Sequence, residues 1–543
     1  MSPGSTIAAV STAPGVGAVS IIRLSGPDSL AVLKRVFTPL EAAAPRMGVF
    51  TLSGNLSLSQ GVAITSAAEK RYGQSPSSGN SFQSPPNFEV WRPRQMRYGR
   101  IQDPENARLL DEVLAVWFPA PHSFTGEEVC EIQGHGGLAV TGLVLAAVLR
   151  AGAELAQPGE FTRRAFMNGR LDLAQAEAVA DLVAARSAAE IGLAARQLAG
   201  GLSEKVEAIH RALFSALAEL TADIDFGDDL EALDLFKLGE RLRSEALTPL
   251  EKLLADGRAG RPFREGLRLA LVGAPNVGKS SLFNALLGSD RALVSDLPGT
   301  TRDFITAGAA WSGLAVELCD TAGLSAAPRD ELDALGQDRS RAQLAQADLV
   351  LWVRDSTRAG LEDEALDPAE LPLDRTLLVW NKIDLAPPPG PEWGNAPPQV
   401  VSAIGRPDHC KQEFAISSDC KSDDLQCTGF SRHQPYGLEG RQTAVSARSG
   451  AGLDQLKAAI LKLATGREDP SPPEVAPNLR HQAALTRTAA ILAETLADLS
   501  AGQPADICAL GLRSALDALE VILGRSTPDD ILNEIFSRFC LGK

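Results

Sequence analysis

The chain has 543 residues, more than one hydrophobic core usually supports, so several domains are expected. Hydrophobic residues make up 44% of the chain and no apolar run reaches the roughly 20 residues of a membrane helix. The net charge of −16 excludes a protein that coats nucleic acid by charge alone, so any RNA contact must be local or shared with a partner. The seven scattered cysteines form no small-domain framework, which favours a reducing, cytoplasmic location.

Short strands and a helix are predicted in the first 168 residues. Strand-like apolar runs occur at 7–10, 18–24, 112–118 and 128–132, and an apolar helix is predicted at 138–149. Residues 54–98 are rich in Ser, Gln, Pro and Gly and lack periodicity, which predicts an inserted loop or a disordered segment. The basic run Arg92, Arg94, Arg97 and Arg100 is expected in a solvated loop. We therefore expect an α+β domain over 1–168.

A helical pattern begins near residue 169 and is interrupted later in the chain. Ala, Leu, Glu and Arg recur at helical spacing to residue 264, as in 174–195 and 202–220. Strand and helix signals then alternate over 265–467, which indicates a parallel α/β sheet with an insertion at about 386–441. Helical spacing returns from residue 479, after the Pro-rich linker 469–477, and 468–543 are assigned to the second part of the helical domain. The prediction is a multidomain α/β plus α protein in which an α/β domain is inserted into a helical domain.

Residues 273–280 (GAPNVGKS) match the phosphate-binding pattern GxxxxGK[ST]. An apolar strand at 267–272 precedes them and a helix at 281–287 follows, so backbone N–H groups and the helix dipole can hold phosphates. Lys279 is expected to reach the β- and γ-phosphates, and the Ser280 hydroxyl to bind Mg²⁺. The alternative is an ordinary glycine-rich turn, which the motifs downstream argue against. The expected nucleotide contacts are Asn276, Val277, Gly278, Lys279, Ser280 and Ser281.

Two further motifs suit the γ-phosphate and the metal. In the polar loop 299–303 (GTTRD), Thr301 is the candidate for a second Mg²⁺ hydroxyl and for a catalytic role in sensing the γ-phosphate. A strand at 316–319 ends in DTAG, where Asp320 can hold Mg²⁺ through water and the Gly323 N–H can contact the γ-phosphate. The expected nucleotide contacts here are Ser295, Asp296, Leu297, Pro298, Gly299, Thr300, Thr301, Asp320, Thr321, Ala322 and Gly323.

The identity of the nucleotide base is predicted from two segments near the end of the α/β region. An apolar strand at 377–380 leads into Asn381, Lys382, Ile383 and Asp384. A carboxylate at Asp384 can accept two hydrogen bonds from the N1–H and 2-amino groups of guanine, which adenine cannot donate. Ser446, Ala447 and Arg448 follow a strand-like stretch and suit the loop that supports guanine. Five motifs in order, each at a strand end, predict a Ras-like, Mg²⁺-dependent GTP hydrolase.

The source of positive charge for hydrolysis is unusual. Leu324 occupies the position at which Ras carries a water-positioning glutamine, and no arginine is placed as a finger in cis. Some other cation must therefore meet the charge that develops on the phosphates. Asn276 and the loop 295–300 offer oxygen ligands that could hold a monovalent cation there.

Motifs outside the nucleotide site carry a family resemblance. They are 13–17 (APGVG), 22–26 (IRLSG), 123–127 (SFTGE), 133–137 (QGHGG), 158–161 (PGEF), 171–177 (LDLAQAE) and 539–543 (FCLGK). Together with the GTPase motifs, they make the chain resemble the MnmE (TrmE) family of tRNA modification GTPases. The resemblance covers nearly the whole chain outside the two insertions.

The resemblance implies an architecture and a reaction. It implies an N-terminal folate-binding domain that forms a homodimer, a helical domain in two segments, and an inserted G domain. It implies that the protein works with an FAD-containing partner, MnmG (GidA), as a heterotetramer in the cytoplasm, away from membranes. The pair would place a carboxymethylaminomethyl-type group on C5 of the wobble uridine of certain tRNAs. A tetrahydrofolate derivative, 5-formyl- or methylene-tetrahydrofolate, would supply the one-carbon unit.

The resemblance also implies roles for particular residues. Folate contacts fall on Arg23, Glu131, Arg170 and Lys543, and potassium ligands on Asn276, Ser295, Leu297 and Thr300. The acid that orients the catalytic water falls on Asp333, with Glu331 as the rival because the spacing from Asp320 is one residue longer than usual. Cys540 is a candidate for a redox or nucleophilic role in the modification.

A ribosome-assembly GTPase of the Era or Der type is the alternative function. That class shares the P-loop asparagine and a hydrophobic residue after DTAG. It would also show a basic RNA-binding tail or a second G domain, neither of which the sequence contains. A switch or scaffold protein without a role in tRNA chemistry is a third possibility.

Overall fold

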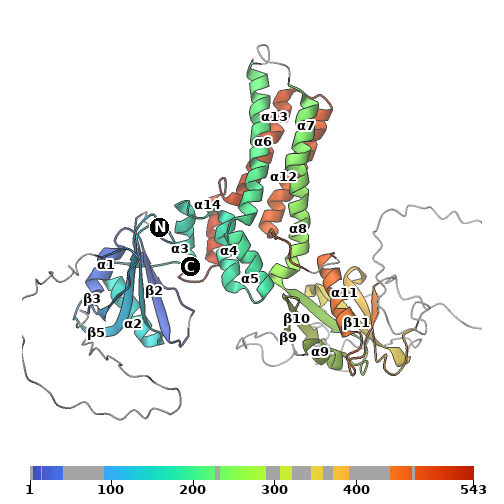
Figure 1. Cartoon of the computed structure of the whole chain (residues 1–543), viewed down its shortest axis with the longest axis horizontal. Helices are drawn as coiled ribbons and strands as arrows, with labels where there is room; N and C mark the ends of the chain where they lie inside the picture. Colours follow the sequence, from blue (N-terminus) through green and yellow to red (C-terminus); the bar gives the residue numbers. More distant parts are fainter. Residues whose placement is uncertain are drawn as a thin grey trace, which may run out of the picture. The chain divides into compact units, whose positions relative to one another are not determined.

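The computed structural model divides into two compact units. It describes residues 4–13, 15–40, 91–226, 233–288, 306–320, 344–358, 371–389, 441–467 and 471–542. One unit joins residues 1–171 to residues 529–543, and the other spans 172–528 (Figure 1). The sequence predicts a helical domain that includes 468–543, whereas in the structure helix α14 (Asp529–Ser537) groups with the N-terminal unit.

The N-terminal unit is built on a sheet with the strand order β3-β4-β5-β6-β2-β1-β7 among the described residues. The strands are β1 (Ile7–Val10), β2 (Val19–Ser25), β3 (Phe37–Pro39), β4 (Arg97–Gln102), β5 (Leu109–Phe118), β6 (Val129–His135) and β7 (Glu154–Leu155). Helices α1 (Ser29–Val36) and α2 (Leu138–Arg150) cover one face, where Leu33, Ile132 and Val148 are fully buried. The predicted strands and the predicted helix are therefore present.

The basic run near residue 92 is only partly a loop. Arg97 and Arg100 lie in β4, which pairs with both β3 and β5, so the prediction of a solvated loop is wrong for these two residues. The Arg100 guanidinium makes an ion pair of 3.0 Å with Glu112 on the adjacent strand. Since one face of this part of the sheet is open to water, alternate positions of β4 can be charged without disturbing the core.

The other face of the sheet is only partly covered. Helix α3 (Glu160–Met167) places Phe161 against Ile7 and Ala9 at the β1 side. In register, Tyr98, Leu114, Gln133 and Ile21 form one row across four strands, on the face away from the α1–α2 core. Tyr98 is 51% exposed and Leu114 is 39% exposed. This face therefore carries apolar side chains in contact with solvent.

Long antiparallel helices dominate the second unit. They are α4 (Leu173–Ala184), α5 (Ala188–Leu198), α6 (Gly201–Phe226), α7 (Leu235–Leu242), α8 (Thr248–Glu265), α12 (Leu479–Ser500) and α13 (Ala505–Leu523). In Figure 1 the green α6 and α8 lie beside the red α12 and α13, which are far away in the sequence. The pattern over 174–195 forms two helices, because the chain turns before Ser187, whose hydroxyl caps α5 through the Glu190 N–H.

The rest of this unit is a sheet with the strand order β13-β12-β11-β8-β10-β9 among the described residues. The strands are β8 (Leu267–Val272), β9 (Thr306–Trp311), β10 (Leu314–Asp320), β11 (Leu349–Asp355), β12 (Thr376–Asn381) and β13 (Gln442–Ala444), and helices α9 (Lys279–Leu287) and α11 (Leu453–Thr465) pack with them. All strand pairs are parallel except β9–β10. The carboxyl ends of the parallel strands therefore meet at one edge, where α/β proteins bind ligands.

A buried polar cluster joins the two segments of the helical bundle. The Glu177 carboxylate on α4 accepts hydrogen bonds from Arg480 at 2.9 and 2.8 Å and lies 2.7 Å from Nε2 of His481, both residues of α12. Arg480 also donates to the Val521 carbonyl at 2.7 Å. Burial alone would raise the pKa of Glu177, but His481 and Arg480 outweigh it and hold that pKa below its ordinary value.

In the described part of the chain, no helix is long and apolar enough to cross a membrane.

We predict that Glu177→Ala lowers the free energy of unfolding of the helical bundle by about 3–5 kcal/mol, because it leaves the largely buried Arg480 and the fully buried His481 without the carboxylate that they share. The matched control is Glu219→Ala, which removes an ion pair of 2.6 Å with Arg241 at the surface of the same bundle. That change should cost about 0–1 kcal/mol. Urea unfolding followed by helical circular dichroism measures both, and equal losses would contradict a structural role for the buried cluster.

Candidate nucleotide-binding site

The phosphate loop lies between β8 and α9 and needs glycine at two positions. Gly273 has φ +148°, and a Cβ there would lie 2.2 Å from the Val353 carbonyl oxygen. Gly278 has φ +94°, and its added Cβ would lie 2.4 Å from Nδ2 of Asn381. The loop thus runs close against the ends of β11 and β12 and turns directly into a helix N-terminus, an arrangement that favours phosphate.

Lys279 and Ser280 open α9 at this edge. The Lys279 ammonium donates to the Gly273 and Ala274 carbonyls at 2.8 and 3.0 Å, so it lies folded over the loop. The Ser280 hydroxyl donates to Oδ2 of Asp320 at 3.1 Å. Asp320, at the end of β10, is 8% exposed, and its Oδ1 has no hydrogen-bond partner among the described residues. A hydroxyl and a buried, half-satisfied carboxylate are oxygen donors of the kind that suits Mg²⁺ beside phosphates.

The predicted guanine-binding residues are brought together beside the phosphate loop. The Asn381 side chain donates to the Val277 carbonyl at 2.9 Å and accepts from the Ala447 N–H at 3.1 Å. It therefore joins the phosphate loop to the 446–448 segment. The buried Ser446 hydroxyl donates to Oδ1 of the exposed Asp384 at 2.7 Å. One carboxylate oxygen is therefore held in place, and the carboxylate is oriented to accept donors from a base. Arg448 is exposed in the same turn.

Comparisons with known proteins agree with this geometry. The family model of the MnmE helical domain matches residues 173–540, and that of the GTP-binding protein TrmE N-terminus matches 6–74 and 47–170. The tRNA modification GTPase MnmE of Moorella thermoacetica is 38% identical over 541 residues, with 99% of each chain covered. The chain belongs to the MnmE family of tRNA modification GTPases. It is thus a GTP-binding GTPase in tRNA modification, and the ribosome-assembly alternative is set aside.

Further similar proteins cover the whole chain or one domain. The MnmE of Roseiflexus castenholzii is 36% identical over 539 residues, with 99% of each chain covered. Among solved structures, the G domain of the T. maritima FeoB iron transporter is 24% identical and covers 36% of this chain and 98% of that one, with a TM-score of 0.21. A superposition that weak says nothing about activity.

Several predicted site residues of this MnmE-family chain lie outside the described residues. They are Ser295, Asp296, Leu297, Pro298, Gly299, Thr300, Thr301, Thr321, Ala322, Gly323, Asp333, its rival Glu331, and Lys543. Their roles stay predictions. The described members of the nucleotide site gather at one edge of the sheet.

The predicted folate residues lie in the N-terminal unit. Arg23 on β2 faces Glu131 on β6 in register, and the two side chains form an ion pair of 2.9 Å. The Arg23 guanidinium also lies 5.2 Å from the ring centroid of Phe124 and 6.0 Å from that of Phe161. Arg170 donates to the Ser123 carbonyl at 3.3 Å. Both arginines therefore contact the 123–124 segment: Arg23 does so from strand β2, and Arg170 from the chain just after helix α3.

The last described residues are anchored at the same part of the sheet. The Ser11 hydroxyl donates to the Gly542 carbonyl at 3.2 Å. Gly542 has φ +88°, and a Cβ there would lie 2.1 Å from the Val10 carbonyl oxygen, so only glycine fits. Val10 follows Ala9, the register partner of Arg23, so the tail ends one strand away from that arginine. Cys540 is exposed in this tail.

One carboxylate at the nucleotide edge was absent from the sequence prediction. Asp355 ends β11, between the strand that leads into the phosphate loop and the strand that leads into the guanine loop. The sequence gives only a weak signal for it, because Asp355 follows the apolar run 349–353 after one arginine and belongs to no motif.

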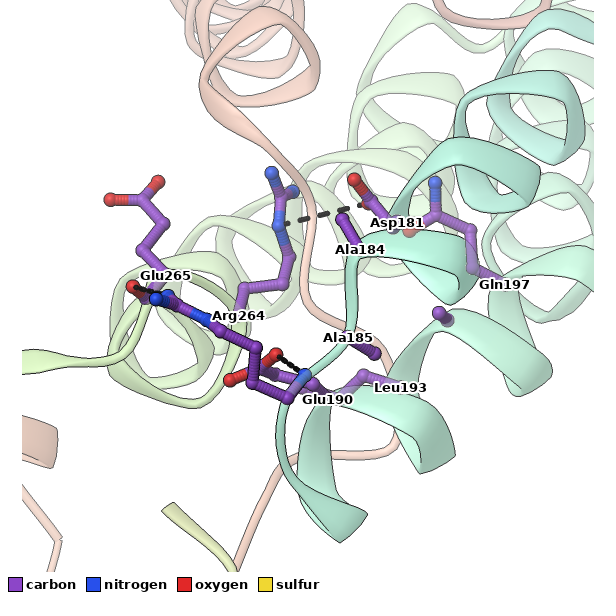
Figure 2. Close-up of a pocket in the computed structure, with 10 residues that line it drawn as sticks. Asp181, Ala184, Ala185, Glu190, Leu193, Gln197, Arg264 and Glu265 are labelled. Atoms are coloured by element: carbon purple, nitrogen blue, oxygen red, sulfur yellow. Dashed lines mark hydrogen bonds and ion pairs between the residues drawn. The ribbon is translucent and has the colours of Figure 1, made fainter. Parts of the chain in front are cut away.

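A pocket in the same unit has none of the predicted nucleotide residues in its lining. The pocket, of about 210 Å³, forms where the α4–α5 corner meets the end of α8 (Figure 2). Arg264 Nε lies 4.0 Å from Asp181 Oδ2, and Arg186 donates to the Glu265 carbonyl at 3.4 Å. Since α8 leads directly into β8, this pocket marks the junction between helical bundle and G domain.

We predict that Asp384→Asn weakens GTP binding and favours xanthosine nucleotides. The new amide presents a donor where guanine presents donors, and it matches the carbonyl of xanthine. Competition binding with GTP and XTP measures the exchange of preference. Unchanged affinities for both nucleotides would exclude Asp384 as the residue that recognises guanine.

Proposed function

We propose that this GTPase, with an FAD-containing partner of the MnmG (GidA) type, modifies C5 of the wobble uridine of certain tRNAs. The added group is of the carboxymethylaminomethyl type, and a tetrahydrofolate derivative, 5-formyl- or methylene-tetrahydrofolate, supplies the one-carbon unit. The observation that carries the proposal is the pairing of Arg23 with Glu131 against two aromatic rings, beside the anchored tail. These are groups that a second ligand besides GTP would need.

The chemistry of a folate fits these residues. A folate has a flat heteroaromatic ring with hydrogen-bond donors and a glutamate tail with negative charge. The partly exposed Phe124 offers a ring face, Glu131 offers an acceptor, and Arg23 and Arg170 offer positive charge, while the buried Phe161 ring packs behind Arg23. Lys543, which follows the anchored Gly542, would add a further cation, and the exposed Cys540 would lie in the same tail.

The open face of the N-terminal sheet supports a homodimer. Arg23 and Glu131 lie two residues along their strands from Ile21 and Gln133, and thus on the same face as the exposed row that includes Leu114. Apolar side chains left in contact with water are a feature of protein–protein interfaces. A second copy on this face would cover the row and lie next to the folate residues. With the partner enzyme, this gives a cytoplasmic heterotetramer.

On the GTPase side, we propose that Ser280 and Asp320 hold Mg²⁺, directly and through water, with Thr301 as the second hydroxyl ligand. When bound, Mg²⁺ neutralises the charge that develops between the β- and γ-phosphates. Lys279 contacts the same phosphates, Gly323 and Asp333 act on the γ-phosphate and its water, and potassium ligands come from Asn276, Ser295, Leu297 and Thr300. The left-handed backbone of Asn276, φ +67°, and its exposed side chain support a position at the loop mouth.

The reaction is tested by removing the tail. Deletion of residues 540–543 should abolish the tRNA modification but leave GTP turnover largely intact, because Gly542 is bound to Ser11 in the N-terminal unit, which also carries the proposed folate residue Arg23, whereas the nucleotide residues belong to the other unit. Mass spectrometry of tRNA nucleosides from a deletion strain that carries the shortened gene measures the modification. A purified-protein GTPase assay is the control, and loss of both activities would indicate misfolding. Full modification by the shortened protein would exclude the tail from the reaction.

Hydrolysis should depend on potassium and on pairing of G domains. Arginine fingers give on the order of 10³–10⁵ in rate, and a K⁺ ion held beside Asn276 would supply such a charge here. The expected result is faster turnover in KCl than in NaCl at equal ionic strength, with pairing in GDP–AlFₓ visible by light scattering. Equal rates in both salts would exclude the idea, as would an Asn276→Ala variant that keeps full potassium stimulation.

A further inference from the structure

Asp355 links the loops of the nucleotide site without belonging to any of their motifs. It is the last residue of β11, which pairs with β8 on one side and with β12 on the other. These two strands lead into the phosphate loop and the guanine loop. The Asp355 carboxylate is 7% exposed, so it lies beneath the surface of the site.

The carboxylate of Asp355 is fixed in position by its own turn. Its Oδ1 accepts hydrogen bonds from the Thr357 N–H at 2.9 Å and from the Thr357 hydroxyl at 2.7 Å. Its Oδ2 accepts from the Lys382 ammonium at 2.7 Å. Burial alone would raise the pKa of Asp355, but these hydrogen bonds outweigh it and hold the pKa below its ordinary value. The group therefore presents a fixed negative charge to Lys382.

Lys382 carries this link to the phosphate loop. The same ammonium donates to the Asn276 carbonyl at 2.7 Å, and its Cε lies 3.9 Å from where a Cβ on Gly278 would be. The aliphatic part of the lysine thus passes beside Gly278 of the phosphate loop, and its ammonium is held between the Asn276 carbonyl and Asp355. Lys382 has φ +66°, a conformation rare outside glycine that persists only where surrounding contacts fix it.

The charge of Asp355 decides where the lysine head lies. The Lys382 side chain is 31% exposed, and a lysine ammonium is strongly hydrated on a flexible stem. Without this buried anion, the partner left to the ammonium among the described residues would be the neutral Asn276 carbonyl. Asn381 makes the other link between these loops, through the Val277 carbonyl.

We propose that Asp355 is a positioning residue for nucleotide binding. It holds the Lys382 ammonium on the Asn276 carbonyl, so that the phosphate loop and the guanine loop form one rigid surface before GTP enters. Contacts of this kind are made equally in the ground state and the transition state, so they act on affinity and not on the chemical step. The proposal concerns the GTPase activity alone and is independent of the tRNA chemistry.

Asp355→Asn keeps the shape of the side chain and removes its charge. We expect the Kd for fluorescent GDP and for a non-hydrolysable GTP analogue to rise about ten- to hundredfold, as loss of a buried hydrogen bond to a charged group implies. At saturating GTP, kcat should stay within about threefold of the original value, while KM rises with the Kd. A fall in kcat at unchanged KM, or an unchanged Kd, would overturn the proposal.

Two comparisons separate positioning from a general loss of stability. Asp348→Asn makes the same change before the other end of β11, where Oδ2 accepts from the Arg268 N–H at 2.9 Å, and it should leave the Kd unchanged. In the background of Lys382→Met, Asp355→Asn should cause no further loss of affinity, because the group it positions is gone. If the two losses multiply instead, or if Asp348→Asn weakens binding as much, Asp355 does not act through Lys382.

Discussion

The helical bundle depends on the return of the chain after a whole domain has been inserted into it. Helices α4 to α8 come before the G domain and α12 and α13 after it, so neither segment alone can bury its apolar face. The buried contacts of Glu177 with Arg480 and His481 fix where the second segment enters. Nearby, Arg196 donates to the Glu474 carbonyl at 2.9 Å, which holds the returning linker against α5. The G domain therefore leaves and re-enters the bundle at neighbouring points, and both connections meet the same group of helices.

The nucleotide edge shows a second use of long-range order. Each of its motifs is a short local sequence, but the site exists only because the strand order brings β8, β10, β11 and β12 side by side. Asn381 and Lys382 then join the guanine loop to the phosphate loop by hydrogen bonds to backbone carbonyls. Glycine at 278 allows the close approach of Asn381 and Lys382, and glycine at 273 allows the loop to lie against the Val353 carbonyl of β11. Pre-organisation of this kind lowers the entropic cost of ordering the loops when the nucleotide binds.

The G-domain strands and the described nucleotide residues were predictable because each motif carries its own context of strand, turn and helix. Asp384, Ser446 and Asn381 lie together as expected, whereas the link through Asp355 was missed, since one aspartate after a strand has no distinguishing pattern. The break before α5 was missed because Ala-rich sequence continues through it, and a capping serine in such a run resembles any other serine. The assignment of α14 to the N-terminal unit depends on packing between residues more than 350 positions apart, such as Arg163 and Asn533, which local periodicity does not report.

That packing has a consequence for synthesis on the ribosome. Gly159 lies close against the carbonyl of Phe536, and the Phe166 ring lies tilted 6.3 Å from the Phe536 ring, so this end of α3 is covered only after α14 has been translated. Domains generally fold in the order of their translation, at about 5–20 residues per second. Here the N-terminal unit must remain incomplete for tens of seconds while the entire second unit is translated. During that interval the surface around Gly159 and Phe166 is a natural target for chaperones, and a chain that stalls late in translation would keep it exposed.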